Sequence, residues 1–418
     1  MMKVNNNVRL HNIKGIDMLM NFDNQAVIGL DESGKKVWNE IYEKGWSAVD
    51  YEKNKELMDS MVELEFVTED YTECKAEDKI DAAYVHLLNR CNLHCIGCYS
   101  MNSDRNREED LSTDKWKLAL KRLRNMGVGE LVISGGEPLL REDIVDLMRY
   151  AKKDLNMESI TLITNGTVSF DFSRLCGLID LLAISIDGYN VENPTFLRDK
   201  GIFEKVVSSI ERAQKSGLEV CMIPTVHKKN CEHLRDYSML ADELGVSINF
   251  SILSVPCNSV FKDFIPDNRS LDTMAQTMFE LNASVDDIAS AGDGICAQCG
   301  CGLGKRMISV DSKGNIYPCH ILHYPNLKLG SIFEEKYGQD SFDNSVISEC
   351  ENATVDSIEG CKECEYKYIC GGGCRGRAYF YSKNLKAKDP YCELFRKFHQ
   401  IEVETIKNAM VKEGKYSA

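Results

Sequence analysis

The sequence lacks several features that would place it in common functional classes. No apolar run approaches the roughly 18 residues that a membrane-spanning helix needs, so we expect no membrane contact. Acidic side chains outnumber basic ones, 65 to 50, and the net charge of −15 disfavours nonspecific nucleic-acid binding. Proline is scarce, at 8 residues, and no long disordered tract is implied. The N-terminal stretch MMKVNNNVRLHN has no apolar core typical of a secretory signal, so we expect a cytoplasmic location.

Cysteine, in contrast, is abundant, with 18 in a chain of 418 residues. Because a reducing compartment does not sustain many disulfides, thiols in this number indicate metal or redox chemistry. The length predicts two to four domains at about 100–200 residues each. We predict a winged-helix domain over residues 1–75, a partial barrel over 76–260 and a helical connection over 261–295. A cysteine-rich domain with little helical periodicity follows over 296–392, and a C-terminal helix over 393–418.

The first block has the pattern of a small winged-helix domain. Strand-like segments at 16–20 and 26–30 flank turn-forming residues. Asp31 is suited to cap a helix that ends near residue 43, and an apolar stripe predicts a second helix over 51–64. Residues 1–80 carry 10 basic and 17 acidic side chains, which is the wrong balance for a DNA-binding winged helix.

The second block alternates short apolar strands with amphipathic helices, which predicts an α/β fold with parallel strands, a partial (β/α)6 barrel. The strands are expected at 82–88, 130–134, 160–164, 181–186, 219–226 and 247–253. The helices between them are expected at 114–126, 141–155, 202–216 and 232–244. In such folds the chemistry takes place at the C-terminal ends of the strands.

Three cysteines follow the first of these strands at the spacing C-x3-C-x2-C: Cys91, Cys95 and Cys98. A loop of this kind can bind three irons of one iron–sulfur cube and leave the fourth iron open for chemistry. The alternative is a structural zinc knuckle that also uses His94.

The motif and its place after the first strand resemble the radical SAM enzymes. The resemblance implies that the three cysteines hold a 4Fe–4S cluster whose open iron chelates S-adenosylmethionine (SAM). One electron then yields a 5′-deoxyadenosyl radical, which abstracts a hydrogen atom. Gly97 stands where the family often has an aromatic residue, and Tyr99 follows instead.

The ends of later strands carry further candidate residues. The second strand ends in Ser-Gly-Gly-Glu-Pro, where Gly135 and Gly136 expose the backbone and Glu137 offers a carboxylate to an ammonium group. A tight turn is the alternative, but the resemblance implies the motif that binds the amino group of SAM. Ser185 and Asp187 end the fourth strand, where the resemblance implies contacts to ribose and carboxylate and the alternative is a capping turn. Residues 164–166, Thr-Asn-Gly, end the third strand and are expected to line the same pocket.

A second cysteine pattern lies downstream. Twelve residues separate Cys301 from Gly314, and four separate Gly314 from Cys319. Downstream come Cys361, Cys364, Cys370, Cys374 and Cys392. This pattern resembles the SPASM extension of radical SAM enzymes, which implies two auxiliary 4Fe–4S clusters and three clusters in all. One would use Cys319, Cys374 and two from Cys296, Cys299 and Cys301. The other would use Cys361, Cys364, Cys370 and Cys392, and the alternative is a pair of zinc ribbons.

The remaining cysteines and the histidines carry weaker signals. Thiols outside the patterns are expected to be buried or incidental: Cys74, Cys176, Cys221, Cys231, Cys257 and Cys350. His227, His320 and His323 are expected to be structural or solvated. His320 directly follows Cys319, where anaerobic sulfatase maturases have an aspartate, and this disfavours formylglycine formation.

The N-terminal block also resembles the recognition element of peptide natural-product maturases. Such an element binds a leader peptide as an added strand at its hairpin edge. A structural cap on the barrel is the alternative. Together the resemblances imply an enzyme that binds a ribosomal precursor peptide, receives electrons from a low-potential donor such as flavodoxin or ferredoxin, and forms an oxidative crosslink, a thioether first and a carbon–carbon bond second. The alternatives are a peptide epimerase, formylglycine formation, an iron–sulfur DNA-binding regulator, and a metal-storage or scaffold protein.

Overall fold

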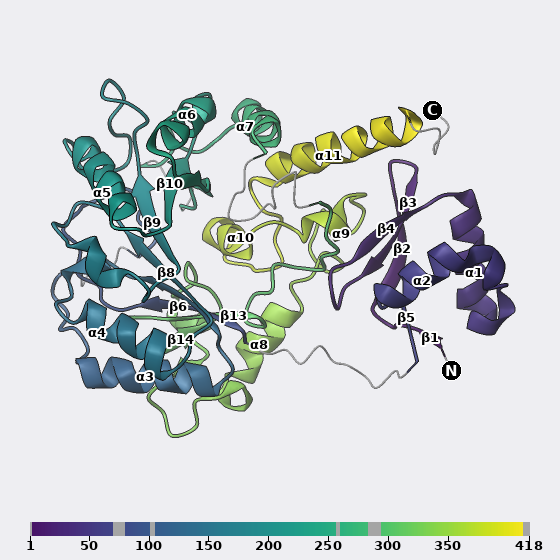
Figure 1. Ribbon diagram of the computed structural model, residues 1–418, viewed down its shortest axis with the longest axis horizontal. Coiled ribbons are helices and arrows are strands. Elements are labelled where there is room, and N and C mark those ends of the chain that lie inside the picture. Colours follow the sequence, from purple (N-terminus) through teal and green to yellow (C-terminus); the bar gives the residue numbers. More distant parts are fainter. Residues whose placement is uncertain (1, 70–79, 101–104, 256–259, 283–293, 413–418) are drawn as a thin grey trace.

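The computed structural model describes residues 2–69, 80–100, 105–255, 260–282 and 294–412 (Figure 1). The barrel lies at the left of Figure 1 and the N-terminal domain at the right, with the cysteine-rich segment between them. The long C-terminal helix runs along the top of the molecule toward the N-terminal domain. Cys74 and Cys257 lie outside the described residues.

The predicted parallel β/α alternation is confirmed. The central strands pair in parallel in chain order: β6 (Ala82–His86), β7 (Glu130–Ser134), β8 (Ser159–Thr164), β9 (Leu181–Ile186) and β10 (Val220–Val226). The helices that follow them are α3 (Thr113–Asn125), α4 (Ile144–Arg149), α5 (Phe203–Lys215) and α6 (Leu234–Leu244). Each presents an apolar stripe to the core, such as the fully buried Trp116, Ala119, Leu120 and Leu123 of α3.

Two elements differ from the prediction. The sixth strand is interrupted, because β11 (Ser247–Ile248) and β12 (Ser251–Ile252) pair with β10 separately. The helix expected from residue 141 begins at Ile144. Arg141 stays outside it because its buried guanidinium bonds to Asp143 and to the carbonyls of Leu87 and Leu111. This helix ends in a π-helical turn, Tyr150–Asp154.

The main sheet continues into the cysteine-rich segment, which the sequence pattern did not indicate. β13 (Met307–Val310) pairs in parallel with β6, and β14 (Asn315–Tyr317) and β15 (Gly330–Ser331) extend the sheet in antiparallel fashion. The helices within this segment are short, and local caps such as Asp343 on α8 support them despite the weak helical periodicity of the sequence. The helices from residue 260 onward are α7 (Asn268–Glu280), α8 (Asn344–Glu351), α9 (Lys367–Cys370), α10 (Arg375–Ser382) and α11 (Cys392–Lys412).

The N-terminal domain is a three-stranded antiparallel sheet with two helices, and the expected hairpin at residues 21–24 is present. The strands at Lys3–Val4, Val8–Ile13 and Val67–Thr68 were not predicted. The elements are β1 (Lys3–Val4), β2 (Val8–Ile13), β3 (Ile16–Asn21), β4 (Val27–Leu30), α1 (Glu32–Lys44), α2 (Lys55–Glu63) and β5 (Val67–Thr68). Asp31 caps α1 by accepting a 2.6 Å hydrogen bond from the N–H of Gly34.

This small sheet is buried on both faces. Leu19 and Leu30 pack against Trp38 and other residues of α1 and α2. The opposite face carries Met18 and Met20, which pack into a core with residues of the cysteine-rich segment and α11, including Ile358, Tyr368 and Val403. Arg9 adds a 2.8 Å ion pair with Asp356. Apolar burial therefore fixes the N-terminal domain against the cysteine-rich segment.

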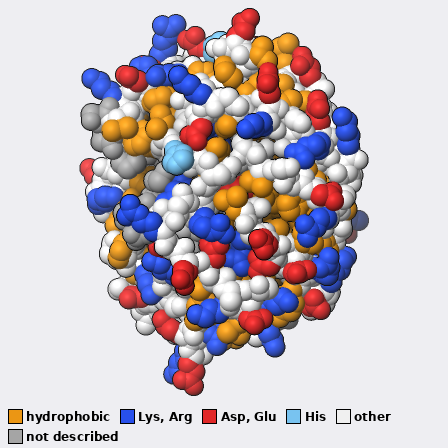
Figure 2. Space-filling model, turned by 90° about the vertical axis from the view of Figure 1, so that its left-hand side faces the viewer, with side chains coloured by type: hydrophobic (Ala, Val, Ile, Leu, Met, Phe, Trp, Pro, Cys, Tyr) orange, Lys and Arg blue, Asp and Glu red, His pale blue; other side chains and the backbone are white. Residues whose placement is uncertain are grey.

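The surface on the barrel side mixes charges of both signs (Figure 2). Across the described ranges, no helix is long and apolar enough to cross a membrane.

Candidate active site

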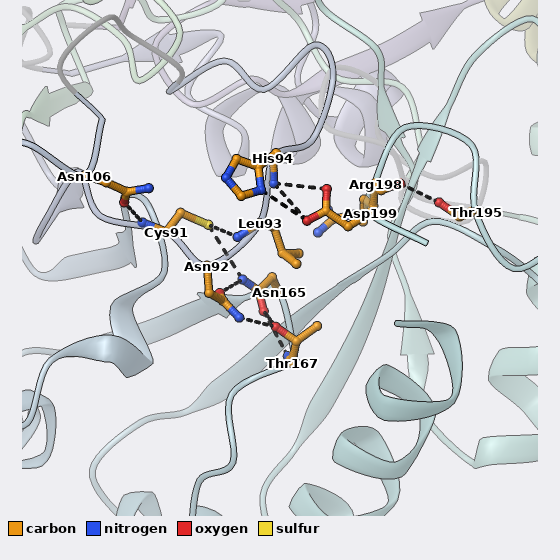
Figure 3. A network of polar contacts seen from close by, with 10 residues as sticks. All are labelled: Cys91, Asn92, Leu93, His94, Asn106, Asn165, Thr167, Thr195, Arg198 and Asp199. Atoms are coloured by element: carbon orange, nitrogen blue, oxygen red, sulfur yellow. Dashed lines mark hydrogen bonds and ion pairs between the residues drawn. The ribbon is translucent and has the colours of Figure 1, made fainter. Parts of the chain in front are cut away.

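The cysteine loop lies directly after β6, at the C-terminal edge of the parallel sheet. The N–H of Cys91 donates to the side-chain oxygen of Asn106 at 2.8 Å, and the N–H of Leu93 donates to the Cys91 sulfur at 3.5 Å (Figure 3). Arg105 donates to the sulfur of Cys98 at 3.6 Å. Donors to sulfur stabilise thiolates, so the loop is organised for ligation by Cys91 and Cys98.

Gly97 and Tyr99 explain the loop's departure from the usual aromatic residue. Gly97 has a φ of +75°, and a Cβ there would lie 2.9 Å from Val255 Cγ1, so glycine is required. The Tyr99 hydroxyl lies 3.0 Å from the Ser134 hydroxyl at the end of β7. The aromatic ring therefore remains at this loop, one residue beyond the third cysteine.

Glu137 connects two strand ends instead of projecting into open space. Its carboxylate accepts hydrogen bonds from the Thr164 hydroxyl and the Asn165 N–H, both at 2.7 Å, and from the Leu139 N–H at 3.0 Å. The side chain is fully buried, and burial raises its pKa while these donors oppose the rise. Gly136 is equally confined, because a Cβ there would lie 1.9 Å from the Arg90 carbonyl oxygen.

Asp187 organises the loop after β9. One carboxylate oxygen accepts hydrogen bonds from the Thr195 hydroxyl at 2.8 Å, from the N–H groups of Leu197 and Arg198 at 2.8 and 3.0 Å, and from the N–H of Phe196. This arrangement brings Arg198 to the wall of the cavity that holds the cysteine loop. Sequence reasoning missed Arg198, because no motif marks it.

A cavity of about 1780 Å³ joins the predicted site residues. From the barrel it is lined by Cys91, Cys95, Cys98, Gly135, Gly136, Asn165, Ser185 and Asp187. Cys299, Cys301, Cys319, Cys370 and Cys374 line it from the cysteine-rich segment, and Phe22, Asp23, Asn24 and Gln25 line it from the N-terminal hairpin. Glu137 lies behind this wall and Cys296 is not part of it.

The four thiols expected to share the second auxiliary site also come together. Cys361, Cys364, Cys370 and Cys392 line one small cavity beside Gly372 and Gly373. Glycine is required at residue 373, since its φ is +69° and a Cβ would lie 2.6 Å from a carboxylate oxygen of Asp389. In the part of the chain that the structure describes, no three His, Cys, Asp or Glu side chains converge on a single metal ion.

Burial keeps many of these thiols protonated until a cation binds. It raises the pKa of Cys95 and of Cys392 to about 11 and that of Cys370 to about 12, and it also raises the pKa of Cys91. Ligation of iron by these thiols would therefore release protons.

The histidines are less isolated than the sequence indicated. His320 stacks on Tyr84 with ring centroids 4.2 Å apart, and His323 lies 4.6 Å from His86. Burial lowers the pKa of His320 to about 3 and that of His323 to about 4. These rings are therefore neutral at physiological pH, and together with Tyr99 they connect the cysteine loop with Cys319.

Comparison with known families identifies the barrel. Residues 85–239 match the radical SAM superfamily. The chain contains a radical SAM domain and is an enzyme of that kind. Such a domain implies SAM and one 4Fe–4S cluster. The match spans the cysteine loop and β7 to β10, and it ends within α6.

Two curated relatives align with this chain over most of their own length. AdoMet-dependent heme synthase of Methanosarcina barkeri is 26% identical over 332 residues, covering 72% of this radical SAM enzyme and 93% of the relative. Mycofactocin maturase MftC of Mycolicibacterium smegmatis is 25% identical over 322 residues, covering 73% and 81%.

Solved structures show the same fold. The structure of anSMEcpe with bound AdoMet aligns with a TM-score of 0.65 at 18% identity, covering 79% of this chain and 99% of that one. SuiB of Streptococcus suis bound to precursor peptide SuiA aligns with a TM-score of 0.60 at 16% identity, covering 94% and 100%. The 6% of this chain left uncovered, about 25 residues, is smaller than the N-terminal domain, so the similarity to SuiB extends into that domain.

Proposed function

We propose that this radical SAM enzyme is a maturase that binds a ribosomal precursor peptide and forms an oxidative crosslink in it. A cysteine-to-carbon thioether is the first product proposed and a carbon–carbon bond the second. The observation that carries the proposal is the single cavity lined both by the N-terminal hairpin turn and by the cysteine loop. A peptide bound at the N-terminal domain therefore has continuous space to the strand ends.

In this proposal Cys91, Cys95 and Cys98 hold the cluster that cleaves SAM to the hydrogen-abstracting 5′-deoxyadenosyl radical. Gly135, Gly136, Ser185 and Asp187 contact SAM beside it, and Glu137 holds the ends of β7 and β8 in place. Cys361, Cys364, Cys370 and Cys392 hold one auxiliary cluster, and Cys319 and Cys374 contribute to another. A flavodoxin or ferredoxin would supply the electron that cleaves SAM. The peptide would lose its first electron as part of the abstracted hydrogen atom, the auxiliary sites would accept its second electron, and the accompanying proton would leave to solvent.

The peptide partner is supported by the edge of the N-terminal sheet. Among the described strands, β4 pairs only with β3. The Asn21 N–H donates to the Ala26 carbonyl, and Leu19 lies opposite Ile28. The antiparallel alternation therefore directs the N–H and C=O groups of Val27 and Gly29 away from β3. An extended leader peptide can pair with these groups, as in other strand-addition complexes.

Relatives support the same assignment. The mycofactocin maturase and PqqA peptide cyclase of Gluconobacter oxydans carry peptide-related names, and SuiB was solved with its precursor peptide. The similarity to heme synthase favours a second candidate, tetrapyrrole modification. Tetrapyrrole modification gives no role to the open edge of β4.

A first experiment tests the radical chemistry. The enzyme, reduced without oxygen, is incubated with SAM and the short peptide encoded beside it, and 5′-deoxyadenosine is measured. We expect the peptide to stimulate its formation and the variant with Cys91, Cys95 and Cys98 changed to alanine to form none while keeping auxiliary iron. Retained formation in that variant, or stimulation by an iron porphyrin but not by the peptide, would overturn the proposal.

A second experiment tests the peptide site with matched variants. Gly29→Pro removes an outward N–H from β4 without removing a bond to β3, whereas Gly29→Ala keeps that N–H. A Cβ at this position would lie 4.0 Å from Ile16, so the Cβ that both variants add fits. We expect peptide affinity to fall at least about tenfold in Gly29→Pro and to change little in Gly29→Ala. Equal peptide affinity in both variants would show that the edge of β4 is not part of the peptide site.

A further inference from the structure

Cys350 lies outside every cysteine spacing pattern, but the structure places it at a cluster site. It belongs to the last turn of α8 and is 6% exposed. Its neighbours along the wall of the large cavity include Cys301, Cys319 and Cys374. Cys350 and these three thiols therefore line one cavity from four separate segments, and Cys299 and Cys370 line it as well.

The local packing brings the Cys350 sulfur close to Gly304, which also lies beside Pro318. A Cβ built on Gly304, three residues after Cys301, would lie 3.6 Å from the Cys350 sulfur and 3.4 Å from Cβ of Pro318. Pro318 directly precedes Cys319, and its carbonyl accepts a 3.3 Å hydrogen bond from the Gly304 N–H. The C-terminal end of α8 therefore packs beside Gly304 and Pro318, which lie close in sequence to Cys301 and Cys319.

The upstream thiol Cys299 also lines the large cavity, but it packs into a different core from Cys350. Cys350, Cys319 and Cys374 belong to the core that extends from the barrel, whereas Cys299 packs into the core shared with the N-terminal sheet. The charged groups that act on Cys299 are Arg9, Asp356, Lys305 and Lys367. The electrostatic neighbours of Cys350 are Glu349, Cys301, Cys319 and Glu351, so Cys350 lies close to both of these cysteines.

We propose that Cys350 is a thiolate ligand of the first auxiliary cluster, together with Cys301, Cys319 and Cys374. This rests on the proposed function, since it presupposes that cluster. It replaces the expectation that two upstream thiols complete the set, and leaves Cys296 and Cys299 unligated. On ligation the Cys350 thiol gives its proton to solvent and a sulfur–iron bond forms, without electron transfer.

The test uses the full chain with Cys91, Cys95 and Cys98 changed to alanine, so that only auxiliary iron remains. Cys350→Ser and Cys299→Ser are added singly, and Cys221→Ser is the matched control, because Cys221 is 7% exposed and lies on β10. Iron and sulfide are counted after anaerobic reconstitution, and Mössbauer spectra identify the cluster type. Neither readout depends on enzymatic activity.

We expect Cys350→Ser to lose about half of the auxiliary iron, from about eight atoms to about four, or to convert one cluster to a three-iron form. Cys299→Ser and Cys221→Ser should keep both clusters. Two unchanged clusters in Cys350→Ser would overturn the assignment while leaving the proposed function intact. Absence of any iron in the parent variant would instead overturn the auxiliary clusters themselves.

A second variant covers the case in which Cys350→Ser does not fold. Cys350→Asp supplies a carboxylate that can ligate iron in place of the thiolate. Under the proposal this variant keeps its iron and one of its two clusters has an altered Mössbauer spectrum. A spectrum identical to that of the parent, with full iron, would show that residue 350 does not touch the cluster.

Discussion

The carboxylate of Glu137, just beyond β7, accepts a 2.7 Å hydrogen bond from the backbone N–H of Asn165, just beyond β8. This bond joins two strand ends at the edge where the cysteine loop lies. The sequence pattern indicated a carboxylate for the SAM ammonium group, whereas the structure gives that carboxylate two strong protein donors and full burial. We therefore expect Glu137 to affect SAM binding through the positions of Gly135 and Gly136.

The variant Glu137→Ala tests whether this carboxylate holds the two strand ends in position. Loss of the acceptor leaves the Asn165 N–H and the Thr164 hydroxyl unpaired, so we expect the free energy of unfolding to fall by about 1–3 kcal/mol and SAM affinity to fall with it. Denaturant unfolding and a SAM-binding titration measure the two effects, with exposed Glu142→Ala as the control. Weaker SAM binding at unchanged stability would instead indicate direct contact with the ligand.

The buried ion pair between Arg377 and Asp389 also holds loop segments in place. Both side chains are 1% exposed and lie 2.9 Å apart. Asp389 also accepts hydrogen bonds from the N–H groups of Cys374 and Tyr391 at 2.6 and 2.8 Å, and its carbonyl accepts one from Cys392. The pair therefore fixes one thiol of each proposed auxiliary site.

Arg377→Met is expected to lower the free energy of unfolding by about 3–5 kcal/mol, because it leaves a buried carboxylate unpaired. Auxiliary iron content should fall as well. Arg149→Met, at the exposed pair with Asp146, should cost about 0–1 kcal/mol. Denaturant unfolding and iron analysis measure both variants, and equal stability of the two would contradict the role assigned to the buried pair.

Protonation of His227 makes the free energy of unfolding depend on pH in a defined direction. Burial lowers its pKa to about 4, partly opposed by Asp187. Because the folded-state pKa lies below the unfolded value of about 6.5, the stabilisation is complete above pH 6.5 and is lost as the pH falls toward 4, by up to about 3 kcal/mol.

His227→Asn retains an acceptor for the Lys229 N–H, which bonds to His227 Nδ1 at 3.1 Å. We expect this variant to lose less stability than the parent between pH 7.5 and 5.5, measured by denaturant unfolding. The half-exposed His233→Asn serves as the control and should retain the parental slope. A parental slope in His227→Asn would show that another group causes the dependence.

Local patterning predicted much of the barrel but could not predict pairings between distant segments. β7 and β9 have the bounds expected from the sequence, because buried parallel strands are continuous apolar runs between polar turns. β13 has only four residues, and it becomes a strand by pairing with β6, more than 200 residues earlier. Cys350 escaped notice for a similar reason, since a ligand brought in by a helix leaves no fixed spacing.

The central claim is that a peptide is oxidised in the large cavity, and the mass of that peptide tests it most directly. The enzyme is expressed without oxygen beside the short peptide encoded next to it, and the peptide is weighed at high resolution. The account predicts the loss of two hydrogens per event, with fragmentation locating a thioether or a carbon–carbon bond. An unchanged mass that gains one deuterium per event in heavy water would mean epimerisation and would contradict the proposed oxidative crosslink.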